Sequence, residues 1–109
     1  MWIFTVDGFF SAVADRDRPG HVIVRMRVRG DGERLQAALE AGELIETPRA
    51  DYRFRIRTTH TRWSDYVASA AAEIDYSNFK AAVGGRDVER AHAYSEVWAF
   101  MRDLQERMP

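Results

Sequence analysis

Arginine recurs at alternate positions in two separate stretches of the chain, and this is its most distinctive chemistry. The six residues are Arg25, Arg27, Arg29, Arg53, Arg55 and Arg57. Side chains two positions apart on a β-strand point to the same face, so each set of three should project from one face. Guanidinium groups bind carboxylates and phosphates, often through two parallel hydrogen bonds. The spacing therefore predicts a surface that binds anionic groups.

Apolar residues fill the alternate positions, and this predicts strands over residues 21–29 and 51–58. On the first strand they are Val22, Val24, Met26 and Val28, and on the second Tyr52, Phe54 and Ile56. Both apolar sets should pack against helices, which would leave both arginine sets on the opposite, open face of the sheet. Six cations on one face repel each other unless anions lie between them.

Three arrangements would relieve this repulsion. Carboxylates of the same chain could interleave with the arginines, and the candidates are Asp7, Asp15, Asp17, Glu43 and Glu46. A partner protein, or a second copy of this chain in a homodimer, could supply them. The face could instead bind a polyanion such as single-stranded nucleic acid, whose bases stack on aromatic rings and guanidinium planes. The available rings are those of Trp2, Phe4, Phe9 and Phe10, whose faces the break at Asp7-Gly8 leaves undefined.

A second candidate site is the segment from Asp75 to Lys80, which mixes polar and aromatic groups most densely. Its possible site residues are Asp75, Tyr76, Asn78 and Lys80. In a small enzyme these side chains would line a cleft together with His60 or His92. The structural alternative is a capped corner between helices, in which the two aromatic rings are buried and Asn78 bonds to the backbone.

Other chemical patterns in the sequence are weaker. His92 and Glu96 are spaced i, i+4 and could share a proton or a metal, but such pairs are commonly exposed helix contacts. A serine triad drawn from Ser64, His60 and Asp65 lacks the G-x-S-x-G elbow. Gly84-Gly85 is not followed by the Lys-Ser/Thr of a phosphate loop. We therefore expect no metal site and no cofactor, and a binding module rather than an enzyme.

The composition of the chain limits its number of domains and its cellular compartment. The chain has 109 residues, net charge −1, 46% hydrophobic and 30% charged residues, which predicts a single domain over residues 1–109. It has no cysteine, which excludes disulfides and thiolate chemistry and fits the cytoplasm. The N-terminal apolar run is too short for a signal peptide, and no stretch is long enough to span a membrane. Arginine supplies fifteen of the sixteen basic residues, as a GC-rich genome would favour.

The elements expected around these residues form the order ββ-α-ββ-α-α. We predict strands over 2–6 and 9–15 interrupted at Asp7-Gly8, and a short strand over 43–46. Helices are predicted over 32–41, from Thr59 or Thr61 to Ile74, over 76–83 and over 87–108. Asp31 is the expected cap of the first helix, and Ser77 that of the third. Hairpin-connected strands favour an antiparallel sheet with the helices on one face. The expected fold is thus a two-layer α+β domain, loosely ferredoxin-like.

The chain resembles, over nearly its full length, a family of short bacterial and phage-encoded proteins of no established function. The resemblance rests on Met1-Trp2-Ile3-Phe4 with Gly8-Phe9-Phe10-Ser11, Glu46-Thr47-Pro48 with Asp51-Tyr52-Arg53, Ile74 to Lys80, and Tyr94 with Val97-Trp98. It implies a stand-alone domain from a phage or actinobacterial genome. It supplies no activity, cofactor or catalytic residue, and it directs attention to residues 75–80.

Overall fold

The computed structural model describes residues 1–40 and 42–108. The chain divides into two compact units, Met1–Ile74 and Asp75–Pro109, and each is described by itself. The first unit contains the whole β-sheet, and the fold is α+β as predicted. No helix among the described residues is long and apolar enough to cross a membrane.

The sheet has five strands in the order β1-β2-β3-β5-β4, and every neighbouring pair is antiparallel. The strands are β1 (Trp2–Thr5), β2 (Gly8–Ala14), β3 (His21–Met26), β4 (Ile45–Glu46) and β5 (Phe54–Thr59). The predicted break at Asp7-Gly8 is a tight turn, with Thr5 directly opposite Gly8. The Thr5 hydroxyl accepts hydrogen bonds from the backbone N–H groups of Asp7 and Gly8, both at 3.1 Å, and this folds the N-terminal segment into a hairpin.

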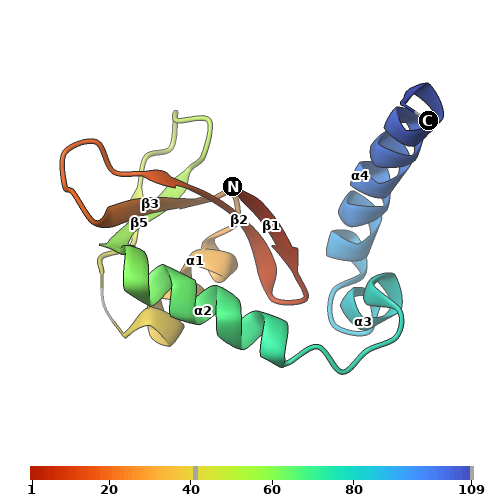
Figure 1. Ribbon diagram of the computed structural model, residues 1–109, viewed down its shortest axis with the longest axis horizontal. Helices are drawn as coiled ribbons and strands as arrows, with labels where there is room; N and C mark the ends of the chain where they lie inside the picture. Colours follow the sequence, from red (N-terminus) through yellow and green to blue (C-terminus); the bar gives the residue numbers. More distant parts are fainter. Residues whose placement is uncertain (41, 109) are drawn as a thin grey trace. The chain divides into compact units, whose positions relative to one another are not determined.

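Two helices of this unit, α1 (Arg29–Leu39) and α2 (His60–Ala72), lie against the same face of the sheet (Figure 1). Every second residue of the strands packs against these two helices, as the sequence predicted. The core consists of Phe10, Ala12, Val22, Val24, Met26, Leu35, Leu39, Phe54, Ile56 and Trp63. Thr59 caps α2 by accepting a hydrogen bond from the N–H of Arg62 at 3.2 Å. Burial of this alternating set defines which face of each strand is inside and which is open.

The predicted strand over 21–29 is too long, because the chain turns into α1 three residues earlier than expected. Val28 is the N-cap residue of α1 and is 50% exposed, so it does not continue the apolar face of β3. Asp31 was expected to cap this helix, and that prediction is wrong. Its buried carboxylate instead accepts a hydrogen bond from the N–H of Phe9 at 3.2 Å and pairs with Arg34 at 2.8 Å. Asp31 thus ties the start of α1 to the first hairpin.

The second unit contains α3 (Phe79–Gly84) and α4 (Val88–Arg107). Asp87, the predicted start of the last helix, is the N-cap of α4. Asn78 rather than Ser77 caps α3, by accepting a hydrogen bond from the N–H of Ala81 at 2.9 Å. The helical spacing of Val88, Ala91 and Val97 in the sequence predicts a buried side for α4, but Ala91 is the only buried residue of this helix. Its large apolar side chains Val88, Trp98 and Met101 are 57–64% exposed.

Candidate interaction surface on the open sheet face

One row of side chains crosses all five strands on the face away from the helices. Trp2 lies opposite Ser11, Ser11 opposite Arg25, Arg25 opposite Arg55, and Arg55 opposite Ile45. Residues opposite each other in a sheet share a face, and all five alternate with core residues along their strands. We call the surface that includes this row the open face. It further contains Phe4, Phe9, Val13, Ile23 and Arg57.

Arg25 and Arg55 form a like-charged pair directly across two central strands. An Nη of Arg25 donates to the Ser11 hydroxyl at 2.7 Å, and an Nη of Arg55 reaches the carbonyl of Tyr52 at 3.4 Å. The Nε–H of each is buried without a hydrogen-bond acceptor. Neither forms an ion pair with a carboxylate among residues 1–40 and 42–108. Among the described residues, no carboxylate therefore neutralises the charge of either guanidinium group.

Tyr52 was expected in the core beside Phe54 and Ile56. It is buried, but it lies outside the core cluster to which those two residues belong. Residues 51–53 form a bend before β5 begins, so the strand alternation does not extend back to Tyr52. Its ring is buried and carries two cations, with the guanidinium carbons of Arg25 and Arg27 at 4.7 and 4.2 Å from the ring centre. Stacking of this kind orders guanidinium groups, so Tyr52 supports the arginines of the open face.

Carboxylates of the same chain neutralise three of the six predicted arginines. Arg57 Nε lies 3.4 Å from Asp15, Arg27 lies 3.4 Å from Asp51, and Arg29 pairs with Glu46. Asp15 and Glu46 were among the carboxylates proposed from the sequence, whereas Asp51 was not. Arg29 is separated from the others because it belongs to α1, where its guanidinium lies over the Phe54 ring.

The open face thus has fewer uncompensated arginines than the spacing predicted. Arg53 is exposed in the bend before β5. The sequence placed six arginines together, and the structure leaves Arg25 and Arg55 as the central pair without a carboxylate among the described residues.

Aromatic side chains occupy the β1–β2 end of the open face. Phe4 and Phe9 stack with ring centres 4.6 Å apart, and Trp2 contacts Phe9 edge-on at 5.9 Å. The Trp2 side chain is 67% exposed, whereas Phe10 points into the core. Strand alternation would have assigned these faces had the turn at Asp7-Gly8 been recognised as a hairpin.

The predicted site at residues 75–80 is built as a helix corner. Asn78 acts as the cap of α3, and the Phe79 ring lies between those of Tyr76 and Tyr94 at 5.7 and 5.8 Å. The side chains of Asp75 and Lys80 are exposed. Neither of the two cavities described next is lined by Asp75, Tyr76, Asn78 or Lys80.

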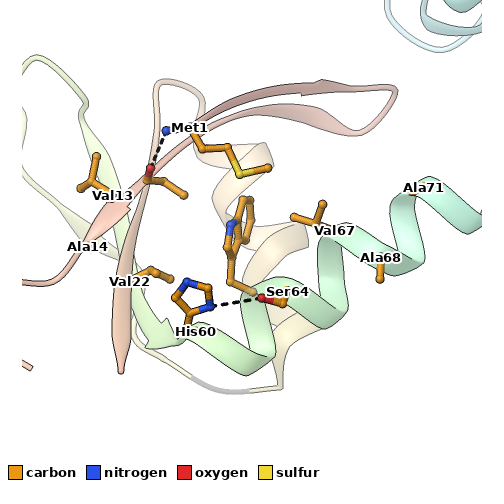
Figure 2. A pocket seen from close by; sticks show the side chains of 11 residues that line it. Met1, Val13, Ala14, Val22, His60, Ser64, Val67, Ala68 and Ala71 are labelled. Atoms are coloured by element: carbon orange, nitrogen blue, oxygen red, sulfur yellow. Dashed lines mark hydrogen bonds between the residues drawn. The ribbon is translucent and has the colours of Figure 1, made fainter. Parts of the chain in front are cut away.

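The first cavity is an apolar groove of about 470 Å³ between α2 and strands β2 and β3 (Figure 2). His60 and Ser64 lie at its rim, with Ser64 Oγ 3.3 Å from His60 Nδ1. Asp65 lines the second cavity instead, so the three residues do not assemble the triad considered from the sequence. Across the described part of the chain, no three His, Asp or Glu side chains are grouped to hold a metal.

The second cavity, about 510 Å³, has both charged and apolar lining residues and lies between α1, α2 and the β1–β2 turn. Tyr66 lines it, and burial raises the pKa of the Tyr66 phenol from 10.0 to about 12. The negative charges of Asp7, Asp31 and Glu73 raise this pKa further, while Arg34 opposes them. The Tyr66 phenol therefore stays neutral through the physiological range.

Comparisons of the chain with protein-family models, with curated proteins and with solved structures gave no match. Function therefore has to be inferred from the side chains of this chain.

Proposed function

We propose that this protein is a non-enzymatic protein-interaction module whose open face binds an acidic surface of a partner protein. The supporting observation is the Arg25–Arg55 pair, which has no carboxylate partner within the described chain. The Tyr52 ring lies beneath Arg25, and Ile45 lies opposite Arg55. Like charges placed directly opposite destabilise a sheet. An external carboxylate that bridges the two guanidinium groups would remove that cost.

The composition of the face favours a protein over a nucleic acid. Arginine and tryptophan are enriched where protein interfaces concentrate their binding energy, and Trp2 and Arg25 belong to one row of the sheet. Val13 and Ile23 add aliphatic area beside them. Internal ion pairs already engage Arg27 and Arg57, so few cations remain for a continuous phosphate backbone.

A fluorescent peptide of alternating Glu and Leu can represent the acidic surface of the partner protein in a binding test. We expect the full chain to bind this peptide. The double variant with Arg25→Gln and Arg55→Gln should bind it about tenfold more weakly, because charge-assisted hydrogen bonds are lost. Fluorescence anisotropy would measure the affinity. The matched control is Arg16→Gln with Arg18→Gln, which removes the same charge from the exposed β2–β3 turn and should leave the affinity unchanged. Equal losses in the two double variants would overturn the proposal.

A second candidate, single-stranded nucleic-acid binding, is favoured by one observation. The exposed Trp2 ring and the stacked Phe4–Phe9 pair lie on the same face as the arginines, and bases stack on such rings. Oligothymidylate would then bind with an affinity that falls steeply with salt, because phosphate contacts release counterions. Trp2→Ala should weaken that binding. Absence of any gel shift at low salt would eliminate this candidate.

A further inference from the structure

Three of the arginines converge on one residue, Tyr52. The guanidinium carbons of Arg25 and Arg27 lie 4.7 and 4.2 Å from the centre of its ring, and an Nη of Arg55 donates to its carbonyl at 3.4 Å. We call Arg25, Arg27 and Arg55 the arginine trio. All of these contacts join residues of the unit Met1–Ile74, so the arrangement of the trio does not depend on the second unit.

Among the described residues, Asp51 is the one carboxylate that pairs with a member of the trio. Its Oδ1 lies 3.4 Å from an Nη of Arg27, which is long for a charge-assisted hydrogen bond of about 2.7–2.9 Å. Exposed ion pairs contribute little to stability, and the Asp51 side chain is 82% exposed. The Asp51 carboxylate can therefore leave Arg27 at low cost, while the Tyr52 ring and the Asp51 backbone carbonyl, 2.9 Å from Arg27, hold the guanidinium in place.

The trio offers two positions for carboxylates. One lies between Arg25 and Arg55, which face each other across β3 and β5, and the other is the position on Arg27 that Asp51 occupies. Because Arg25 and Arg27 contact the same ring, their guanidinium carbons are separated by no more than the sum of 4.7 and 4.2 Å. Acidic side chains two residues apart on an extended segment share a face and lie about 7 Å apart, whereas adjacent ones point to opposite sides. The two positions thus match acidic residues at alternate positions.

We propose that the arginine trio recognises an extended segment of the partner protein with acidic residues at alternate positions. One partner carboxylate bridges Arg25 and Arg55, and the next replaces Asp51 on Arg27. Asp51 is then an internal competitor that neutralises Arg27 until the partner binds. Charge favours such a segment, because three guanidinium groups and one carboxylate leave the site positive. This inference rests on the proposed function and adds to it the spacing of the partner's acidic residues and the role of Asp51.

Two fluorescent peptides of equal composition test the spacing. One alternates Glu and Leu, and the other repeats Glu-Glu-Leu-Leu, so that carboxylates on one face of an extended chain lie about 13–14 Å apart. In fluorescence anisotropy the full-length chain should prefer the alternating peptide by about threefold, because a partner carboxylate that approaches Arg27 more closely than Asp51 does forms the stronger pair. Arg27→Gln should abolish this preference by weakening the binding of the alternating peptide alone.

The two peptides separate this inference from the proposed function. If the wild-type chain binds both with equal affinity, the inference is overturned and the proposed function stands. If the chain binds neither peptide, both are wrong.

Asp51→Asn removes the competing charge and keeps the size of the side chain. Affinity for the alternating peptide should rise about two- to fivefold, since an exposed ion pair no longer has to be broken, and affinity for the Glu-Glu-Leu-Leu peptide should stay the same. In the Arg27→Gln background the same substitution should have no effect. Glu46→Gln, which breaks the ion pair with Arg29 instead, is the matched control and should change neither affinity. An equal gain for both peptides in Asp51→Asn would indicate general charge attraction and overturn the role of Asp51.

Discussion

At the scale of the residue, Arg55 lies in surroundings that lower the stability of the folded chain. It faces Arg25 directly across the sheet, and its buried Nε–H has no acceptor. A like-charged pair costs a few tenths of a kcal/mol to about 1 kcal/mol, and an unsatisfied buried donor costs about 1–3 kcal/mol. Selection for stability alone would not favour such a residue, and its presence agrees with a role in binding.

We therefore expect Arg55→Gln to raise the free energy of unfolding by about 0.5–1 kcal/mol, because it removes the repulsion and the orphaned donor. Urea unfolding at low salt measures the change, which should shrink as salt screens the charges. Arg53→Gln, in the exposed bend, is the control and should stay within about 0.5 kcal/mol of the wild type. A clear loss of stability in Arg55→Gln would contradict this account of the pair.

Tyr66 supplies a prediction with a defined pH window. Its pKa is about 12 in the folded chain and 10.0 ordinarily, so the unfolded chain loses the phenolic proton first as pH rises. The stabilisation linked to Tyr66 is complete below pH 10 and is lost between pH 10 and 12. In Tyr66→Phe this part of the pH dependence should vanish, as followed by urea midpoints across that range. An unchanged profile would mean that other groups govern alkaline unfolding.

At the scale of the element, the contact between the first hairpin and α1 depends on one glycine. A Cβ on Gly8 would lie 2.7 Å from Cγ of the buried Asp31, whose carboxylate accepts the N–H of Phe9. Any side chain at position 8 must displace this carboxylate and loosen the connection of α1 to the sheet. The hairpin also positions Trp2 and Phe9, so the open face depends on the same contact.

Gly8→Ala should accordingly lower the free energy of unfolding by about 1–3 kcal/mol, the usual cost of overpacking a tight site. Chemical denaturation would measure it. Gly30→Ala, within α1, is the matched control, since a Cβ there meets only the flexible end of Arg34 at 3.3 Å, and alanine favours the helix. Equal effects of the two substitutions would show that the contact with Asp31 is not the cause.

At the scale of the whole molecule, the core that holds the sheet lies entirely in the first unit. Its buried residues run from Phe10 to Trp63, and Ile3, Leu44, Tyr66 and Val67 pack against them. The sequence predicted a single domain over 1–109, and the structure divides the chain into the compact units Met1–Ile74 and Asp75–Pro109.

A fragment of residues 1–74 is expected to fold without the second unit, because it keeps every residue of the core cluster. It should unfold cooperatively in urea and retain strand signal in circular dichroism. A fragment that is unfolded in water would show that residues 75–109 are needed for stability of the sheet.

The sequence by itself determined the local structure of this protein. Apolar alternation predicted β3 and β5 near their observed positions, and Thr59 and Asp87 marked helix starts that the structure confirms. These signals come from neighbours in the chain, since side-chain period and capping hydrogen bonds act over a few residues.

Tertiary structure alone decided which of these residues meet. It placed Arg25 opposite Arg55, paired Arg27 with Asp51, moved Arg29 onto a helix, and brought the Tyr52 ring beneath two guanidinium groups. It also brought residues of α2, β2 and β3 together around the apolar groove. Strand register, ion pairing and packing join residues far apart in sequence, and no local periodicity encodes them.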